Sequence, residues 1–266
     1  MIQLMLHKTL VYRDAQIAYY FAENKEKETI LLLHPAFADH EIFEAQTESF
    51  MEDYQVIAVD MPGHGDSQIK GRNVTLKDMP AILHQIMSDH EISALHIVGV
   101  SMGSLVAQAF ADRYPERVKS VTMVGGYSIH KANEQILKAQ KKEGLKWLGY
   151  MLFSMKKFRD HVISVSCYTD RCRTVFRRGI GKFHRKSFSV MSGMNSFFRK
   201  QDTPVRYPLL IIVGQQDQQM IREAANTIHK LEKGSQLAVL PAAGHCANLD
   251  APEEFNRLVK DFLLDQ

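Results

Sequence analysis

Short apolar runs and stretches of helical spacing alternate along the first 126 residues of the chain. Continuous apolar runs are typical of strands buried on both faces, and they span residues 28–34, 54–60, 95–100 and 118–124. The stretches between them repeat apolar residues at helical spacing, and they span residues 40–52, 75–89 and 102–114. Strands that alternate with helices in this way predict an α/β fold, in which helices flank a mostly parallel central sheet.

The two ends of the chain extend this pattern. Two apolar runs on either side of Arg13-Asp14, at residues 2–12 and 15–22, predict an antiparallel hairpin. Beyond residue 203 the alternation resumes, with strands expected at 207–213 and 236–240 and helices at 221–231 and 252–264. We therefore expect residues 1–126 and 204–266 to form one core.

The middle of the chain, residues 127–203, has helical spacing and no convincing buried strand. Helices are expected there at residues 129–142, 145–165, 172–180 and 187–200. This segment carries 17 Lys and Arg against 5 Asp and Glu, whereas the remainder carries 16 against 25. The pattern and the charge together predict a basic helical cap inserted into an acidic core.

The sequence Gly99-Val100-Ser101-Met102-Gly103 joins a predicted buried strand to a predicted helix of small residues. A serine in such a sharp turn is held in a strained conformation that projects its Oγ above the sheet, and the glycines admit neighbouring backbone. The helix that follows directs free N–H groups and partial positive charge at anything bound beside Ser101. This arrangement suits nucleophilic attack on a carbonyl, although so short a motif also arises by chance.

An acid and a base candidate follow the serine in the order nucleophile, acid, base. Asp217 comes after the strand expected to end at Val213, and His245 comes after the strand expected to end at Leu240. A serine hydroxyl needs an imidazole to take its proton, and the imidazole needs a carboxylate to fix its tautomer. In open parallel sheets, sites lie beyond the carboxyl ends of the strands. The sequence therefore predicts a catalytic group of Ser101, Asp217 and His245.

Other polar residues compete for these roles. Asp250 is a rival acid, but its position just before a helix favours a capping role. Cys246 is a rival nucleophile that would leave Ser101 unexplained. The remaining candidates are interpreted as loop and turn residues, and they are His34, Asp60, His64 and Asp66.

At this point the chain resembles the α/β-hydrolase superfamily, in the branch of capped serine hydrolases that includes carboxylesterases and lipases, with the cap inserted after the sixth strand. The matching segments span the core, and they are Leu33-His34-Pro35-Ala36-Phe37, Asp60-Met61-Pro62-Gly63-His64-Gly65-Asp66-Ser67, Gly99-Val100-Ser101-Met102-Gly103, Gly214-Gln215-Gln216-Asp217 and Gly244-His245 with Leu249, Pro252 and Phe255.

The resemblance implies a site and an activity. In this family two backbone N–H groups hold the oxyanion, and the matching residues here are Ala36 and Met102. The chain has Pro35 where the family usually has glycine, which leaves the N–H of Ala36, or that of Phe37, to donate. The implied activity is hydrolysis of a carboxylic ester or related acyl bond through an acyl-enzyme, without a cofactor.

The same fold and residues serve other reactions. These are hydrolysis of a C–C bond, a lactone, an amide or a thioester, and acyl transfer when water is excluded. A different class of function is a ligand receptor or signalling protein that keeps a hydrolase-like pocket. Slow, near-stoichiometric consumption of ligand would indicate the receptor, and multiple turnovers on simple esters would indicate the enzyme.

The predicted cap holds many methionine and aromatic residues and a run of basic ones. Phe37, Met151 and Met155 are candidates for the wall of a substrate pocket, since methionine adapts to irregular ligands, but ordinary helix packing accounts for them equally well. The basic run is either a solvated face or an attraction for an anionic or lipid-like substrate. Its residues are Arg171, Arg173, Arg177, Arg178, Lys182, Arg185 and Lys186.

Composition narrows the setting. The odd number of cysteines, Cys167, Cys172 and Cys246, has no metal-type spacing, and it favours reduced thiols in the cytoplasm over disulfide or metal frameworks. The N-terminus has no pattern of a signal peptide, and no apolar stretch reaches the length of a membrane span. No recognised nucleic-acid motif accompanies the basic run, so we expect a small-molecule substrate.

Overall fold

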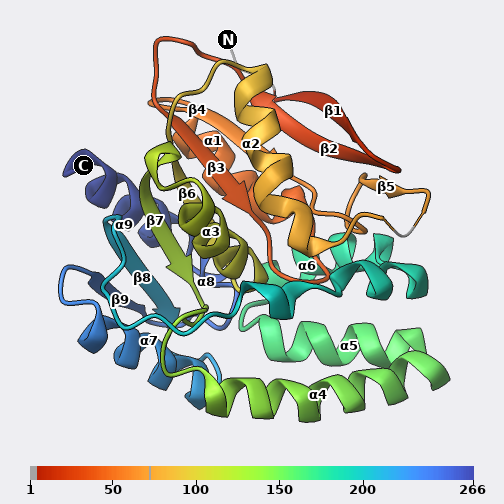
Figure 1. Ribbon diagram of the computed structural model, residues 1–266. Coiled ribbons are helices and arrows are strands. Elements are labelled where there is room, and N and C mark those ends of the chain that lie inside the picture. Colours follow the sequence, from red (N-terminus) through yellow and green to blue (C-terminus); the bar gives the residue numbers. More distant parts are fainter. Residues whose placement is uncertain (1–4, 72) are drawn as a thin grey trace.

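The computed structural model describes residues 5–71 and 73–266, with the backbone alone at residues 140–142, 145, 146, 148, 151 and 152. Its central sheet has the strand order β1-β2-β4-β3-β6-β7-β8-β9, and β5 pairs with β2 (Figure 1). The strands are β1 (Leu6–Tyr12), β2 (Ala15–Ala22), β3 (Thr29–Leu33), β4 (Gln55–Val59), β5 (Gln68–Ile69), β6 (Leu95–Val100), β7 (Val118–Val124), β8 (Leu209–Gly214) and β9 (Gln236–Leu240).

The sheet is mostly parallel, as the pattern predicts. The pairs from β4 through β3, β6, β7 and β8 to β9 are parallel. The β1–β2 hairpin is antiparallel and joins the sheet at β4, which it also pairs antiparallel. Parallel strands place their carboxyl ends at one edge, and Figure 1 shows the central arrows pointing toward the side where the helices of the middle segment lie.

Helices cover both faces of the sheet (Figure 1). Those of the predicted core are α1 (Glu44–Phe50), α2 (Met79–Asp89), α3 (Met102–Arg113), α7 (Gln219–Leu231), α8 (Ala247–Asp250) and α9 (Pro252–Leu264). Short 3-10 turns are η1 (His40–Phe43), η2 (Leu76–Asp78) and η3 (Pro115–Arg117).

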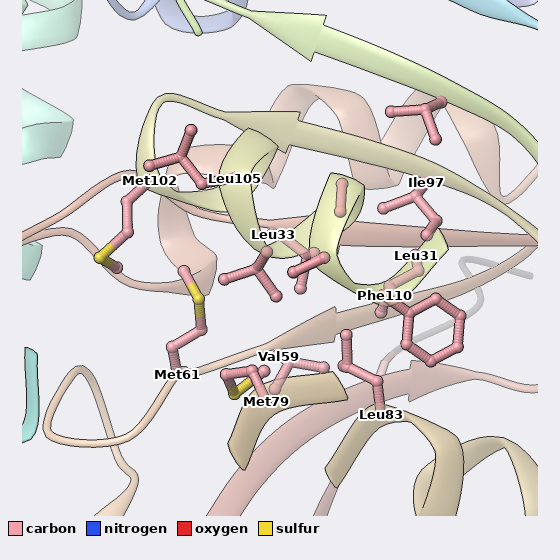
Figure 2. Packing of buried hydrophobic residues seen from close by; sticks show 14 of the residues in the cluster. Leu31, Leu33, Val59, Met61, Met79, Leu83, Ile97, Met102, Leu105 and Phe110 are labelled. Carbon is pink, nitrogen blue, oxygen red and sulfur yellow. The ribbon is translucent and has the colours of Figure 1, made fainter. Parts of the chain in front are cut away.

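Alternate residues of the buried strands feed two hydrophobic clusters, one on each face. Leu31 and Leu33 of β3 pack with residues of α2 and α3, such as Leu83 and Phe110, in the cluster shown in Figure 2. The intervening residues of β3 face a second cluster that holds residues of α1 and α9. Both faces of β3 are buried because helices cover both, which explains its unbroken apolar sequence.

The middle segment contains α4 (Glu134–Phe153), α5 (Met155–Ser166) and α6 (Asp170–Lys182), followed by the 3-10 turns η4 (Arg185–Met191) and η5 (Met194–Phe197). The expected break near residue 143 is wrong, because α4 continues through it. The break falls at Ser154, whose side chain accepts a hydrogen bond from the Lys157 N–H and so begins α5. The helix expected at residues 187–200 is instead the pair of 3-10 turns.

The cysteine prediction is wrong for two of the three residues. Cys167 and Cys172 form a disulfide that closes the turn between α5 and α6. Cys246 is a free, buried thiol. Sequence spacing could not indicate the bond, since whether two cysteines pair depends on how the turn brings their Cα atoms to 5.3 Å.

In the part of the chain that the structure describes, no helix combines the length and the apolar character that a bilayer span requires.

Candidate active site

Ser101 sits in a sharp turn between β6 and α3. Its φ is 50° and its ψ is −111°, a backbone conformation that residues other than glycine rarely adopt. A Cβ at Gly99 would collide with the backbone at Gly103, and a Cβ at Gly103 would collide with the carbonyl of Leu33. The two glycines of the motif are therefore required by close backbone approach, as the sequence predicts.

The structure brings Ser101, His245 and Asp217 together at the carboxyl edge of the sheet. His245 Nε2 lies 2.8 Å from Ser101 Oγ, and His245 Nδ1 lies 3.0 and 3.1 Å from the two carboxylate oxygens of Asp217. Asp217 lies just beyond β8 and His245 just beyond β9, so separate strands present each group. The row of hydrogen bonds fits proton transfer from the hydroxyl to Nε2 while Nδ1–H donates to the carboxylate.

The charge of Asp217 controls the protonation of His245. The Asp217 side chain is fully buried, whereas that of His245 keeps 15% of its surface exposed. Burial by itself lowers the pKa of His245, but the adjacent carboxylate and its hydrogen bond outweigh burial and raise the pKa above 6.5. Asp217 also accepts a hydrogen bond from the Gln218 N–H at 2.7 Å, which fixes the carboxylate.

The two expected oxyanion donors, Ala36 and Met102, come from the loop after β3 and from the start of α3. Met102 is the first residue of α3, and no described residue accepts a hydrogen bond from its N–H or from that of Ala36. Ala36 follows β3, whose end lies against Gly103. The next residue, Phe37, has a φ of 69°, so the backbone reverses here. The role of the two N–H groups as oxyanion donors stays a prediction.

His34 and His64 serve the loops, in keeping with their interpretation. His34 is fully buried, with Nδ1 donating to the Pro35 carbonyl and Nε2 accepting from the Met61 N–H. Burial lowers the pKa of His34, and it lowers the pKa of His64 to about 3. Both imidazoles are therefore neutral at pH 7 and tie loops together.

Asp60 is a turn residue, as expected. Its carboxylate accepts hydrogen bonds from the N–H groups of His40 and Asp66, both at 2.8 Å. The Asp66 carboxylate accepts from the hydroxyl of Tyr20. The contacts of Asp60 join the loops after β3 and β4. The two carboxylates are thus bonded to these loops and to Tyr20, and not to His245.

The Asp250 carboxylate is directed at backbone N–H groups and not at the His245 ring, and the capping role expected for it is wrong. The residue before α9 is Ala251, and that helix begins without a side-chain cap. Asp250 instead accepts hydrogen bonds from Gly244 and from the turn that precedes α6. Cys246 is fully buried, and burial raises the pKa of its thiol well above 9.0, so it is no nucleophile at neutral pH.

The candidate pocket residues come from the loop after β3 and from the helices α4 and α5. Phe37 is 2% exposed, and its ring makes edge contacts with Trp147, Phe158 and Phe183 at centroid distances of 5.0–5.2 Å. Met155 is half-buried against the same cluster. The side chain of Met151 lies outside the described residues. Phe37 therefore links the loop of Ala36 to the aromatic interior of the cap.

The basic run of the cap is largely paired within the chain. Ion pairs join Arg178 and Lys182 of α6 to Glu41 of η1 at 3.2 and 2.8 Å. Arg171, Arg173 and Arg177 pair with Glu253, Asp170 and Asp160. Arg185 and Lys186 line an open groove of about 1070 Å³ between η4 and the loop after β4. Much of the positive charge thus holds α6 against the core.

One contact near His245 escaped the sequence analysis. Gly125 follows β7 with a φ of 56°, and a Cβ there would lie 2.9 Å from the His245 carbonyl and 3.0 Å from Nδ1. Only glycine leaves room for the imidazole in this position. The sequence feature that could have indicated this contact is the Gly125-Gly126 pair, which directly follows a buried strand at the same edge of the sheet.

The site shows no sign of a metal centre. Within residues 5–71 and 73–266, no three His, Cys, Asp or Glu side chains gather as metal ligands would. The chemistry that the described residues supply is that of a hydroxyl, an imidazole, a carboxylate and backbone N–H groups.

Comparison with known proteins agrees with this fold. The sequence profile of the alpha/beta hydrolase fold family matches residues 28–151. The chain is 27% identical to the 2-hydroxy-6-oxononadienedioate/2-hydroxy-6-oxononatrienedioate hydrolase of Escherichia coli, over 89% of this chain and 87% of that protein. It is 23% identical to monoacylglycerol lipase ABHD6 of Bos taurus, over 95% of this chain and 80% of that protein.

A solved structure gives the same result for the fold. A hydrolase from Pseudomonas aeruginosa superposes with a TM-score of 0.81 at 20% identity, covering 97% of this chain and 98% of that one. The chain has the α/β-hydrolase fold and is similar to proteins of that superfamily. The two relatives named above are hydrolases of different substrates, so the comparison supports a hydrolase and leaves its substrate open.

Proposed function

We propose that the protein is a serine hydrolase of carboxylic esters or related acyl bonds. The observation that carries the proposal is the row of hydrogen bonds from Ser101 through His245 to Asp217. It is supported by the N–H groups of Ala36 and Met102, from which no described residue accepts a hydrogen bond. A strained serine at a helix N-terminus, with an imidazole placed to accept its proton, suits attack on an acyl carbon.

In the proposed reaction, Ser101 Oγ bonds to the carbonyl carbon while its proton passes to His245 Nε2. The N–H groups of Ala36 and Met102 stabilise the resulting oxyanion, and each such donor contributes about 3 kcal/mol. The C–O bond to the leaving alcohol then breaks as His245 returns the proton to that oxygen. Water attacks the acyl-enzyme by the same path in reverse, releases the acid and restores Ser101.

The substrate class rests on the relatives and on the cap. The monoacylglycerol lipase relative supports an ester with an apolar acyl group, and Phe37 and Met155 are the residues we propose to contact it. A second candidate comes from the Escherichia coli relative, a hydrolase of 2-hydroxy-6-oxo dioates. An anionic substrate of that kind has less support here, because ion pairs already occupy most of the basic run.

Intact-protein mass spectrometry after exposure to a fluorophosphonate tests the nucleophile. We expect one covalent adduct on the native protein and none on Ser101→Ala. Ser120→Ala is the matched control, because Ser120 also hydrogen-bonds an imidazole but is 1% exposed. An adduct on the folded Ser101→Ala protein would refute the assignment.

A chain-length series of p-nitrophenyl esters tests the reaction. Many turnovers per Ser101 support an esterase, and the preferred acyl length measures the pocket. Rapid turnover of a 2-hydroxy-6-oxo-dienedioate with none of any ester would support the second candidate. Labelling with only stoichiometric consumption would indicate a ligand receptor.

A further inference from the structure

The loop that carries His245 is held on one side by Asp250, the last residue of α8, and on the other by Ser166, the last residue of α5. The N–H of Gly244, the residue before His245, donates to Asp250 Oδ2 at 2.8 Å. The N–H of Cys246, the residue after it, donates to the carbonyl of Ser166 at 3.0 Å. The backbone on each side of the proposed base is therefore anchored outside the core sheet.

Asp250 is the centre of this anchorage. Its Oδ2 also accepts from the Tyr168 N–H at 3.1 Å, and its Oδ1 accepts from the N–H and the hydroxyl of Thr169, both at 2.7 Å. Each carboxylate oxygen thus accepts two hydrogen bonds, and all four donors are N–H or O–H groups. Charge-assisted bonds of this kind are stronger and more directional than neutral ones.

The same contacts fix the start of α6. Thr169 is the N-terminal cap of that helix, and its side chain accepts from the Cys172 N–H at 3.2 Å. A Cβ added to Gly244 would lie 3.3 Å from Asp250 and from Tyr168, so the loop and the turn are in close contact. The position of α6 and the position of the His245 loop are consequently set by one carboxylate.

We infer that Asp250 is a positioning residue that aligns His245 with Ser101 and Asp217 and couples this alignment to the seating of the cap. The inference rests on the proposed function, in which His245 is the base. Asp250 does not touch His245 itself, so it acts through Gly244. A misplacement of a reacting group by about 1 Å costs on the order of 100-fold in rate, so loss of the anchorage is expected to be visible in kcat.

Asp250→Asn tests the inference, because the amide offers one acceptor oxygen and sets an N–H₂ group against donors. We expect kcat for an ester to fall about 10- to 100-fold with KM little changed. We also expect the apparent pKa of the acid limb to fall toward 6.5, since the contact with Asp217 that raises the pKa of His245 is loosened. Glu253→Gln is the matched control, because its ion pair with Arg171 spans the same junction at 3.7 Å between exposed side chains. It should leave both quantities unchanged.

A merely structural role makes a different prediction. A lower melting temperature with native kcat and a native pH profile in Asp250→Asn would overturn the inference. Should that variant fail to fold, Thr169→Val removes one donor to Asp250 and keeps the carboxylate. It should lower kcat and the acid-limb pKa in the same directions by smaller amounts, and native values for both would also overturn the inference.

Nuclear magnetic resonance titration of the His245 ring separates this inference from the proposed function. If the native protein neither labels at Ser101 nor hydrolyses esters, the function fails on its own terms. A lower His245 pKa in Asp250→Asn would still support the positioning role, and an unchanged one would refute it.

Discussion

Two groups in the described part of the chain join a serine hydroxyl, an imidazole and a carboxylate by hydrogen bonds. The first is Ser101, His245 and Asp217. In the second, His96 Nδ1 lies 2.8 Å from Ser120 Oγ, and His96 Nε2 lies 3.0 Å from Glu28. The distances are nearly the same, so the residue types and spacings alone do not distinguish the groups.

Their places in the fold do distinguish them. Ser101 lies at the carboxyl end of β6, in a strained turn before a helix, whereas Ser120 lies inside β7, where it is in register with His96 of β6. Ser120 is 1% exposed and its backbone belongs to the sheet. The second group therefore has no free N–H donors of a helix start beside its hydroxyl and no route for a substrate.

The charges also differ. Burial lowers the pKa of His96 despite its bond to Glu28, because that carboxylate is half exposed and is shared with Lys119. The pKa of His245 is raised by a buried carboxylate that faces the imidazole. A hydrogen-bonded row becomes a candidate catalytic group only when the strand end, the helix start and an undivided charge coincide.

The largest difference between the two groups is expected when the Ser101 hydroxyl is removed. We expect Ser101→Ala to lower kcat for an ester by about 10⁶-fold, because the nucleophile is removed and His245 has no catalytic role without it. Steady-state kinetics with a melting curve as the folding control checks this. Activity within tenfold of the native value would contradict the role of Ser101.

The carboxylates give the next largest difference. Asp217→Asn should lower kcat by about 10⁴-fold, since the amide favours the wrong tautomer of His245 and no longer stabilises its charge. Glu28→Gln is the matched change in the second group and should leave kcat unchanged. Equal losses in the two variants would mean that Asp217 acts only through stability.

The pH dependence should separate the two imidazoles. A base must be neutral, so kcat/KM should rise with pH through the raised pKa of His245, above 6.5. His245 contributes stability that is full below 6.5 and is lost as pH rises through its folded pKa. His96 has a lowered pKa, so its contribution is present above 6.5 and is lost as pH falls through its folded pKa. Nuclear magnetic resonance titration of the two rings measures both pKa values, and pKa values on the same side of 6.5 for His245 and His96 would contradict this prediction.

The smallest effect is expected for Ser120→Ala. The change leaves His96 Nδ1 without its buried partner and should destabilise the fold by about 1–3 kcal/mol. Ester turnover at a temperature well below the melting point should stay native. Denaturant unfolding measures the first quantity, and a loss of turnover in the folded variant would show that the second group also serves catalysis.

Local pattern predicts much of this molecule because the strands are buried on both faces and the turns after them carry distinctive residues. For that reason the strand before Ser101 and the order of Asp217 and His245 could be predicted from the sequence. The role of Asp250 was not, because its partners at residues 168 and 169 are some 80 positions away. The same holds for the ion pairs of α6, which depend on how the cap is seated.

The second hydrophobic cluster has a consequence for how the protein is assembled. It contains Phe37 and Phe43 of the core together with Phe158 and Phe176 of the cap helices. The helices of the middle segment therefore share one apolar interior with the core and cover a surface that the core leaves apolar. Replacing these helices by those of a related protein would therefore require replacing the loop around Phe37 as well. The helices and this loop have to change together.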